Sequence, residues 1–257
     1  MCGVIMNSKI CDYADIDELK VFHGYDIRIS DKIAIRQPTL EEVCNYGERQ
    51  YFSMVYNLTS VGADMKFQLW DLGIDYTEIN DFDLFYSFLY RGYTQKQTEI
   101  LFGDLDLSKM RVYERKKDKS RVLYDAENEI TIDEFTYMAI MDVLRQMHGF
   151  KRNSKIPANK STKMILIEDD REDYLRNKNK PYHSQMKNLI SALVNCEGFK
   201  YNYETVFDLK INVFLDASKR LQKIKNADLL LQSGYSGFGI KLKDVPKKDI
   251  DWMGELN

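Results

Sequence analysis

Signals that start and stop helices recur along the first half of the chain and limit it to short helical segments. Pro38 precedes a capping box from Thr39 to Glu42, in which each side chain can bond to the other residue's backbone N–H. Gly73 and Gly92 each follow an apolar stretch, and glycine at such a position ends helices. We therefore expect three short amphipathic helices up to residue 92, packed on one another.

Apolar residues at helical spacing define the buried face expected for each of these helices. The three sets are Val43, Tyr51, Val55 and Leu58, then Met65, Leu69 and Leu72, and then Phe82, Phe85 and Leu89. A further set, Phe135, Ala139, Val143 and Met147, follows a second capping box at Thr131 to Glu134 and ends before Gly149. This pattern predicts a fourth, longer helix.

A period-two pattern interrupts the helices between residues 110 and 125. Met110 to Glu114 and Arg121 to Asp125 alternate around the charged tip Arg115 to Ser120, which predicts a β-hairpin. Lys32 to Arg36 is a candidate third strand. The first half of the chain therefore combines helices with a small antiparallel sheet.

A basic segment separates this half from the rest of the chain. Lys151 to Lys163 carries five basic residues, no acidic residue and Pro157, which is typical of a loop or linker. Helical spacing resumes over residues 164–174 and 186–194. The last long segment, 203–233, is also helical in pattern, and Gly234, Gly237 and Gly239 break it. Within it, Asp216 and Arg220 can pair at i, i+4.

Together these patterns predict an α+β protein, predominantly α-helical, with one small antiparallel β-hairpin or three-stranded sheet. We expect an N-terminal arm (1–30), a helical domain with the β-hairpin (31–150), a basic linker (151–163), a second helical domain (164–240) and a C-terminal tail (241–257).

Composition restricts the class of protein further. Hydrophobic residues make up 44% of the chain, which excludes disorder as the main state, and the formal charge of -3 does not favour general attraction to nucleic acid or anionic membranes. The longest apolar run, Tyr137 to Met141, falls far short of the roughly 20 residues of a membrane span. Residues 1–10 lack the apolar stretch of a secretory signal. The four cysteines are widely spaced, so a reducing cytosolic setting fits best.

No pattern typical of an active site or metal site is present. His23, His148 and His183 lie in separate segments without metal-ligand spacing, and we expect structural or surface roles for them. The acidic stretch 168–173 sits in a helical pattern, where adjacent carboxylates diverge and cannot all face one ion. The glycines at 234–239 follow a helix instead of a strand, unlike a phosphate-binding loop. We expect a protein that is not an enzyme and binds no cofactor or metal.

Charge and apolar content point to surface interactions. An acidic run at 71–83 is either a docking face or a set of helix caps, and basic runs lie at 109–121 and 151–163. The basic runs match no nucleic-acid-binding motif, so nucleic acid is not favoured as a partner. Eleven methionines and many aromatic residues suggest an adaptable binding face. The candidate partner contacts, each of which can equally be core, are Tyr51, Met54, Met65, Leu69 and Trp70.

Several blocks of residues resemble a known family. These are 36–43, 46–55, 68–76, 101–109, 147–151 and 214–226, including Gln68-Leu-Trp-Asp-Leu-Gly-Ile-Asp-Tyr76 and Leu101-Phe-Gly-Asp-Leu-Asp-Leu-Ser-Lys109. Over roughly residues 30–255 the chain resembles a structural-module protein family of tailed phages and prophages of Gram-positive hosts. Members of that family resemble tail assembly chaperones. The motifs carry no catalytic meaning.

The resemblance implies a non-enzymatic tail assembly factor in the host cytoplasm. Its expected partners are the tape-measure protein, whose amphipathic helices it would keep soluble, and the tail-tube protein. Self-association is a further expectation, because the acidic and basic runs are opposed in charge. One alternative is a virion structural component at the head–tail junction or tail, forming homo-oligomeric rings. A second alternative is a nucleic-acid-associated protein.

Overall fold

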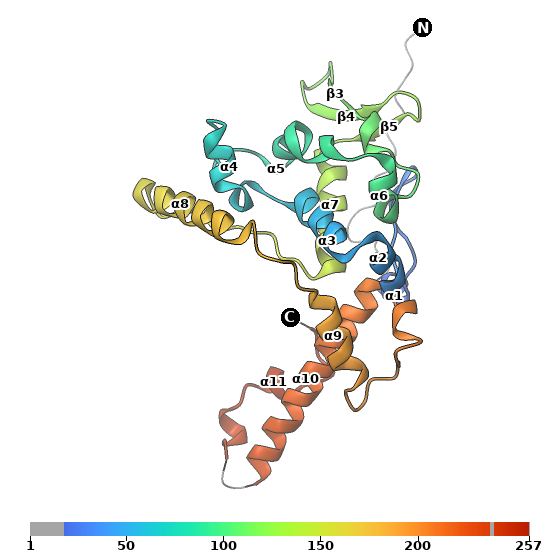
Figure 1. Ribbon diagram of the computed structural model, residues 1–257, viewed down its shortest axis with the longest axis vertical. Helices are drawn as coiled ribbons and strands as arrows, with labels where there is room; N and C mark the ends of the chain where they lie inside the picture. Colours follow the sequence, from blue (N-terminus) through green and yellow to red (C-terminus); the bar gives the residue numbers. More distant parts are fainter. Residues whose placement is uncertain (1–17, 237–238, 257) are drawn as a thin grey trace.

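Helices form most of the structure, a computed structural model that describes residues 18–236 and 239–256. It is 57% helical, with a two-stranded hairpin and a three-stranded antiparallel sheet. The predicted α+β class is therefore confirmed. The three-stranded sheet lies at one end of an elongated molecule, and the α10–α11 pair lies at the other (Figure 1). Most of the predicted N-terminal arm and Gly237 lie outside the described residues.

The first predicted capping box is confirmed, but the helix that follows is broken. Thr39 and Glu42 exchange both cap hydrogen bonds at the start of α2 (Leu40–Tyr46), with N···O distances of 2.8 and 3.1 Å. α2 ends just before Gly47, whose φ of 98° is not helical, and α3 (Glu48–Thr59) begins directly after this glycine. The single apolar face predicted for Val43 to Leu58 is therefore divided between two helices, although all four of its residues are buried.

The next two predicted helices are present in modified form. α4 (Lys66–Asp71) stops before Gly73, which has a φ of 73°, but Leu72 is exposed, so its assignment to the buried stripe was wrong. α5 (Asp81–Leu84) continues as a π-helical turn η3 (Phe85–Leu89) and a 3-10 turn η4 (Tyr90–Gly92). The other helical segments before the three-stranded sheet are α1 (Glu18–His23), η2 (Gly62–Asp64), α6 (Gln95–Phe102) and η5 (Leu107–Lys109).

The predicted β-hairpin is confirmed, and its third strand comes from an unexpected place. β3 (Arg111–Glu114) pairs antiparallel with β4 (Arg121–Asp125), with Tyr113 opposite Val122. β5 (Ile130–Ile132) completes that sheet. The strand predicted at Lys32 to Arg36 does form, as β2 (Ile33–Ile35), but it pairs with β1 (Ile27–Ser30) in a separate hairpin.

Helix α7 (Glu134–His148) is the centre of the packing. It contacts α3, α5, α10 and strands β1, β2 and β5. The predicted cap at Thr131 was wrong, because Thr131 pairs with Tyr124 in β5, and the Asp133 carboxylate accepts the Thr136 N–H instead. Phe135, expected on the buried face, is 71% exposed. The predicted stop at Gly149 is confirmed by its left-handed conformation.

The second half of the chain is helical, as expected. It contains α8 (Lys160–Asn177), α9 (Gln185–Val194), η6 (Val206–Asp208), α10 (Ile211–Tyr235), η7 (Leu242–Asp244) and α11 (Lys247–Ile250). The end of the predicted basic linker is helical, because α8 already begins at Lys160. The predicted ion pair of Asp216 and Arg220 is not formed. The Arg220 guanidinium donates instead to the carbonyls of Trp252 and Gly254, so the tail folds back on α10.

One apolar core runs through both halves. It includes Ile35 and Leu144 from the first half and Ile190, Ile211 and Phe214 from the second. Within the described residues, α9 and the start of α10 therefore share their buried surface with α2, α3 and α7, and the rest of α10 extends beyond it (Figure 1).

The break at Gly47 yields a stability prediction. Gly47→Ala should lower the free energy of unfolding by about 1–2 kcal/mol, because a side chain strains the backbone at a φ of 98° and the added Cβ would lie 2.6 Å from the Gln50 amide oxygen. Urea denaturation measures this change. Gly92→Ala is the matched control, since Gly92 has an ordinary φ and open space, and its unfolding midpoint should stay level or rise.

Candidate partner-binding site

An apolar cavity of about 850 Å³ lies where the second half of the chain packs against the first. Helix α3 supplies Phe52 and Tyr56 to one wall, and α9 supplies Leu189 and Ala192 to the other. The full lining is Glu48, Arg49, Phe52, Ser53, Tyr56, Asn57, His148, Phe150, Tyr182, Gln185, Met186, Asn188, Leu189, Ala192 and Leu215. Tyr56 and Ala192 are exposed, so the apolar walls are accessible from outside.

A carboxylate at the start of α3 holds α9 in place. The Glu48 Oε1 atom accepts the backbone N–H groups of Gln185 and Met186 at 3.1 and 3.0 Å, at the positive end of the α9 dipole. Burial opposes the charge of Glu48, but hydrogen bonds from Ser184, Tyr182 and these N–H groups outweigh it and lower the pKa of Glu48. Met186 is buried beneath this cap. The width of the cavity is thus set by a charge-assisted contact.

A second apolar cavity, of about 330 Å³, lies between α2 and the same helix α9. Leu40 and Val43 line it from α2, and Ile190 lines it from α9. Tyr203, in the segment after α9, and Phe207, in η6, complete the apolar lining. Helix α9 therefore has apolar hollows on two sides. Both are within the size range of pockets that bind small molecules or side chains.

The floor of the larger cavity contains a buried hydrogen-bond chain. His148 Nδ1 lies 2.7 Å from the Leu144 carbonyl oxygen, which can only accept, so Nδ1 carries the proton. The Tyr51 hydroxyl then donates to His148 Nε2 at 2.6 Å. Burial lowers the pKa of His148 to about 4, against the effect of the Leu144 carbonyl, and burial also raises the pKa of Tyr51. Near neutral pH this pair is uncharged and serves to join α3 to α7.

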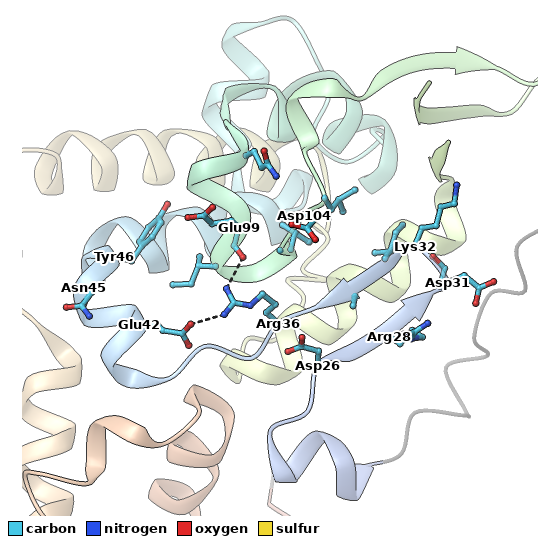
Figure 2. A pocket seen from close by; sticks show the side chains of 18 residues that line it. Asp26, Arg28, Asp31, Lys32, Arg36, Glu42, Asn45, Tyr46, Glu99 and Asp104 are labelled. Carbon is cyan, nitrogen blue, oxygen red and sulfur yellow. Dashed lines mark hydrogen bonds and ion pairs between the residues drawn. The ribbon is translucent and has the colours of Figure 1, made fainter. Parts of the chain in front are cut away.

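A polar cavity of about 820 Å³ lies on the other side of α2, between the β1–β2 hairpin and α6 (Figure 2). Its charged lining consists of Asp26, Arg28, Asp31, Lys32, Arg36, Glu42, Glu99 and Asp104. The Arg36 guanidinium donates to the Glu42 carboxylate at 2.8 Å and to the Glu99 carbonyl at 3.2 Å. Arg36 therefore ties β2 to α2 and α6. The lining mixes both signs of charge and does not converge on one chemical group.

The acidic run at 71–83 is largely neutralised inside the chain. Arg171 forms two hydrogen bonds with the Asp71 carboxylate, at 2.7 and 2.8 Å, and Arg152 pairs with Asp81 at 2.8 Å. Lys163 pairs with Asp75, and although burial opposes the charge, Lys163 and Thr77 lower the pKa of Asp75 to about 2. Acidic and basic side chains of these segments therefore pair with each other within one molecule. The pair of Arg171 with Asp71 binds α8 to α4.

Several bases in the β3–β4 hairpin and directly before it also have acidic partners nearby. Lys109 pairs with Glu127 at 2.6 Å, Arg115 pairs with Asp133 at 3.0 Å, and Lys119 pairs with Glu114 at 3.3 Å. The rings of Tyr113 and Tyr124, on paired strands, contact each other edge to face. These pairs reduce the positive charge that the hairpin can offer to phosphate groups.

The candidate contact residues divide between core and surface. Tyr51, Met54 and Leu69 are buried, so they pack inside the protein and their side chains are not available to a partner at the surface. Met65 is partly buried, and Trp70 is 40% exposed on α4. The structure does not bring Trp70 into the α3–α9 cavity.

Sequence reasoning missed the residues that line this cavity. Phe52 and Tyr56 lie at i, i+4 on α3, offset from the buried stripe of Tyr51, Val55 and Leu58. The sequence does show this second apolar stripe on the helix, and it could have indicated a further contact surface. It does not identify α9 as the opposite wall, because that contact joins residues more than 100 positions apart.

Comparison with known proteins identifies one segment. Residues 177–257 match the family model of the YomV second domain. YomV is a protein of the Bacillus prophage SPβ. The matched segment includes α9, α10 and α11, and so one wall of the cavity. No curated protein and no solved structure matches the chain.

Among the described residues, no helix has both the length and the apolar character needed to cross a membrane. In the same part of the chain, His, Cys, Asp and Glu side chains do not gather in any group of three that fits a metal ion.

The buried His148 predicts a pH dependence of stability. The unfolded chain takes up a proton near the ordinary pKa of 6.5, whereas the folded protein does so near 4. The contribution is therefore complete above pH 6.5 and is lost as the pH falls towards 4, by about 3 kcal/mol at most. Urea unfolding between pH 7 and pH 4 measures this slope. His148→Gln should flatten it, whereas His183→Gln, at an exposed histidine, should leave it unchanged.

Proposed function

We propose that the protein is a non-enzymatic phage assembly factor that holds amphipathic helices of tail proteins in the α3–α9 cavity. The observation that carries this proposal is the cavity itself, about 850 Å³ of space with aromatic and aliphatic walls that are open to the surface. An amphipathic helix buries its apolar face in such a groove through side chains spaced at i, i+3 and i+4.

The polar lining of the cavity supports a helical occupant. It includes Glu48 and Arg49 from α3 and Gln185 and Asn188 from α9. The Arg49 guanidinium lies 5.9 Å from the centre of the Tyr182 ring, so it flanks the apolar wall. Polar groups around an apolar centre are the arrangement expected of a protein-binding surface. They can orient the polar side of an amphipathic helix, while Phe52 and Leu189 contact its apolar side.

The biological setting rests on two separate supports. The match of residues 177–257 to a domain of a prophage protein supports a role in a phage or prophage. The resemblance of the blocks at 68–76 and 101–109 to structural-module proteins suggests the partners, namely the tape-measure and tail-tube proteins. In this proposal the protein acts in the host cytoplasm before the tail is complete.

Co-expression with the tape-measure and tail-tube proteins encoded beside it tests the proposal. Affinity capture of the wild-type chain should retain both proteins. Tyr56→Asp and Ala192→Asp should each reduce retention of the tape-measure protein about tenfold or more, because a carboxylate in the apolar wall must be desolvated when a helix binds.

The matched control places the same charge on another exposed apolar position. Phe135→Asp, at the opposite end of α7 from His148, should retain both partners as the wild type does. Loss of binding in the control as well as in the cavity variants would contradict a specific role for the cavity. Failure of the wild type to retain either protein would contradict the function.

A second candidate function is a structural component of the virion. It is favoured by the part of α10 and the tail that extend from the core, where Leu229, Tyr235 and Met253 are 64%, 79% and 71% exposed. Apolar side chains in such a position suit an interface between subunits.

Mass spectrometry of purified particles separates the two candidates. The assembly factor should be absent from the finished virion and present in lysates of cells that are assembling tails. Detection in the particle at the level of the tail-tube or head–tail proteins would reverse this conclusion and support the structural component.

A further inference from the structure

The outward face of α8 is not covered by any other part of the chain that the structure describes. Ile165, Asp169 and Glu172 lie at i, i+4 and i+7, on the opposite side of the helix from the buried Ile167. Ile165 is 61% exposed. Asp169 and Glu172 are exposed and form no ion pair with another described residue.

Carboxylates on and beside this face repel one another when it is exposed to solvent. Asp169 and Asp173 are separated by one helical turn, as are Glu168 and Glu172, and like charges at this spacing destabilise a helix. Within the described part of the chain, Arg171 pairs with Glu168 and Arg176 pairs with Asp173, which offsets this repulsion in part. A cationic partner on the outside of α8 would therefore remove an unfavourable interaction as well as add favourable ones.

The body of the protein holds this face rigidly. On its inner side, α8 is bound to α4 by Arg171 with Asp71, by Asp170 with Lys66, and by Phe67 with Tyr174, whose ring centres are 5.2 Å apart. Lys163 adds its pair with Asp75. In Figure 1, α8 lies at the side of the molecule, beside α4. It is thus a preformed surface, for which little ordering is needed on binding.

The complementary surface is the tip of the β3–β4 hairpin. Lys116 and Lys117 are exposed there and form no ion pair with another described residue, unlike Lys119. Tyr113, on β3, is 49% exposed and can cover an apolar side chain. The hairpin stands at one end of the molecule, well away from α8 (Figure 1), so the two surfaces of one chain do not meet.

We propose that a second copy of this chain places its β3–β4 hairpin tip on the outer face of α8. Lys116 and Lys117 of one copy pair with Asp169 and Glu172 of the next, and a tyrosine ring covers the exposed Ile165. Because the two surfaces differ, the contact is head to tail. Repetition produces a closed ring or an open filament, according to the rotation between copies.

Another copy fits the hairpin better than nucleic acid does. A phosphate backbone is bound through several cations in a row, and each contact adds to the salt dependence of binding. Lys109, Arg115 and Lys119 are already paired with carboxylates of the same chain. The two lysines equal in number the two carboxylates on α8 that form no ion pair with a described residue, and they carry the opposite charge. Such exposed pairs contribute mainly to association rate and register, so the assembly should depend on salt and on protein concentration.

Sedimentation velocity of the full chain, treated with nuclease, tests the inference. The sedimentation coefficient should rise with protein concentration at low salt and return to the monomer value at high salt. The paired substitutions Lys116→Glu with Lys117→Glu should abolish the rise. The substitutions Asp169→Lys with Glu172→Lys should abolish it equally, since each pair reverses one surface of the contact.

Mixing the two charge-reversed proteins provides the sharpest readout. The reversed α8 of one meets the reversed hairpin of the other, and the two unchanged surfaces also remain compatible, so the mixture should regain the assembly that neither shows alone. Lys96→Glu with Lys225→Glu reverses two other exposed lysines and should assemble like the wild type. These exposed substitutions leave the core unchanged, and circular dichroism verifies folding.

Three results would overturn the inference. They are a wild-type chain that stays monomeric at every concentration in low salt, reversed variants that assemble as the wild type does, and a mixture that stays monomeric. Assembly that occurs only when nucleic acid is added back would assign the hairpin to nucleic acid instead. Each of these outcomes leaves the test of the α3–α9 cavity unaffected, because the variants lie outside its lining.

Discussion

The structure depends on a short backbone junction between residues distant in sequence. The Leu40 N–H donates to the Leu209 carbonyl and the Ile211 N–H donates to the Pro38 carbonyl, each at 2.9 Å. These bonds satisfy backbone groups at the starts of two helices, which would otherwise be buried without partners. They place the fully buried Ile211 and Phe214 against α2 and α7. The position of α9, and therefore the cavity, follows from this junction and from the Glu48 cap.

Local features of the fold were predictable because neighbouring residues determine them. The Thr39–Glu42 capping box, the stop at Gly149 and the β3–β4 hairpin all depend on residues a few positions apart. The break at Gly47 was not predictable, since an apolar stripe continues across it. Thr131 was mistaken for a cap because it precedes Glu134 by three residues, but pairing with β4 took it into a strand. Tertiary pairing therefore decided between two locally acceptable structures.

The site was harder to predict, because an apolar stripe does not reveal what covers it. Tyr51 and Met54 share helix α3 with Phe52 and Tyr56, and by composition the four are alike. Tyr51 is inside because its hydroxyl reaches His148, 97 residues later, whereas Tyr56 faces the cavity because α9 passes at a distance set by Glu48. Only these long-range contacts distinguish the buried Tyr51 from the exposed Tyr56. The same holds for Trp70, which is exposed beside the buried Leu69.

Charge runs in the sequence showed which segments attract each other but not whether they do so within one chain. The carboxylates of Asp71, Asp75 and Asp81 form ion pairs with α8 and with the segment before it, so the acidic run stabilises the fold. Among the described residues, the carboxylates on the far side of α8 and the two lysines at the hairpin tip are charges that form no such pair. Neither surface overlaps the lining of the α3–α9 cavity. Occupation of the cavity by a partner helix is therefore sterically independent of contact between copies, and a self-assembled array could present one cavity per chain.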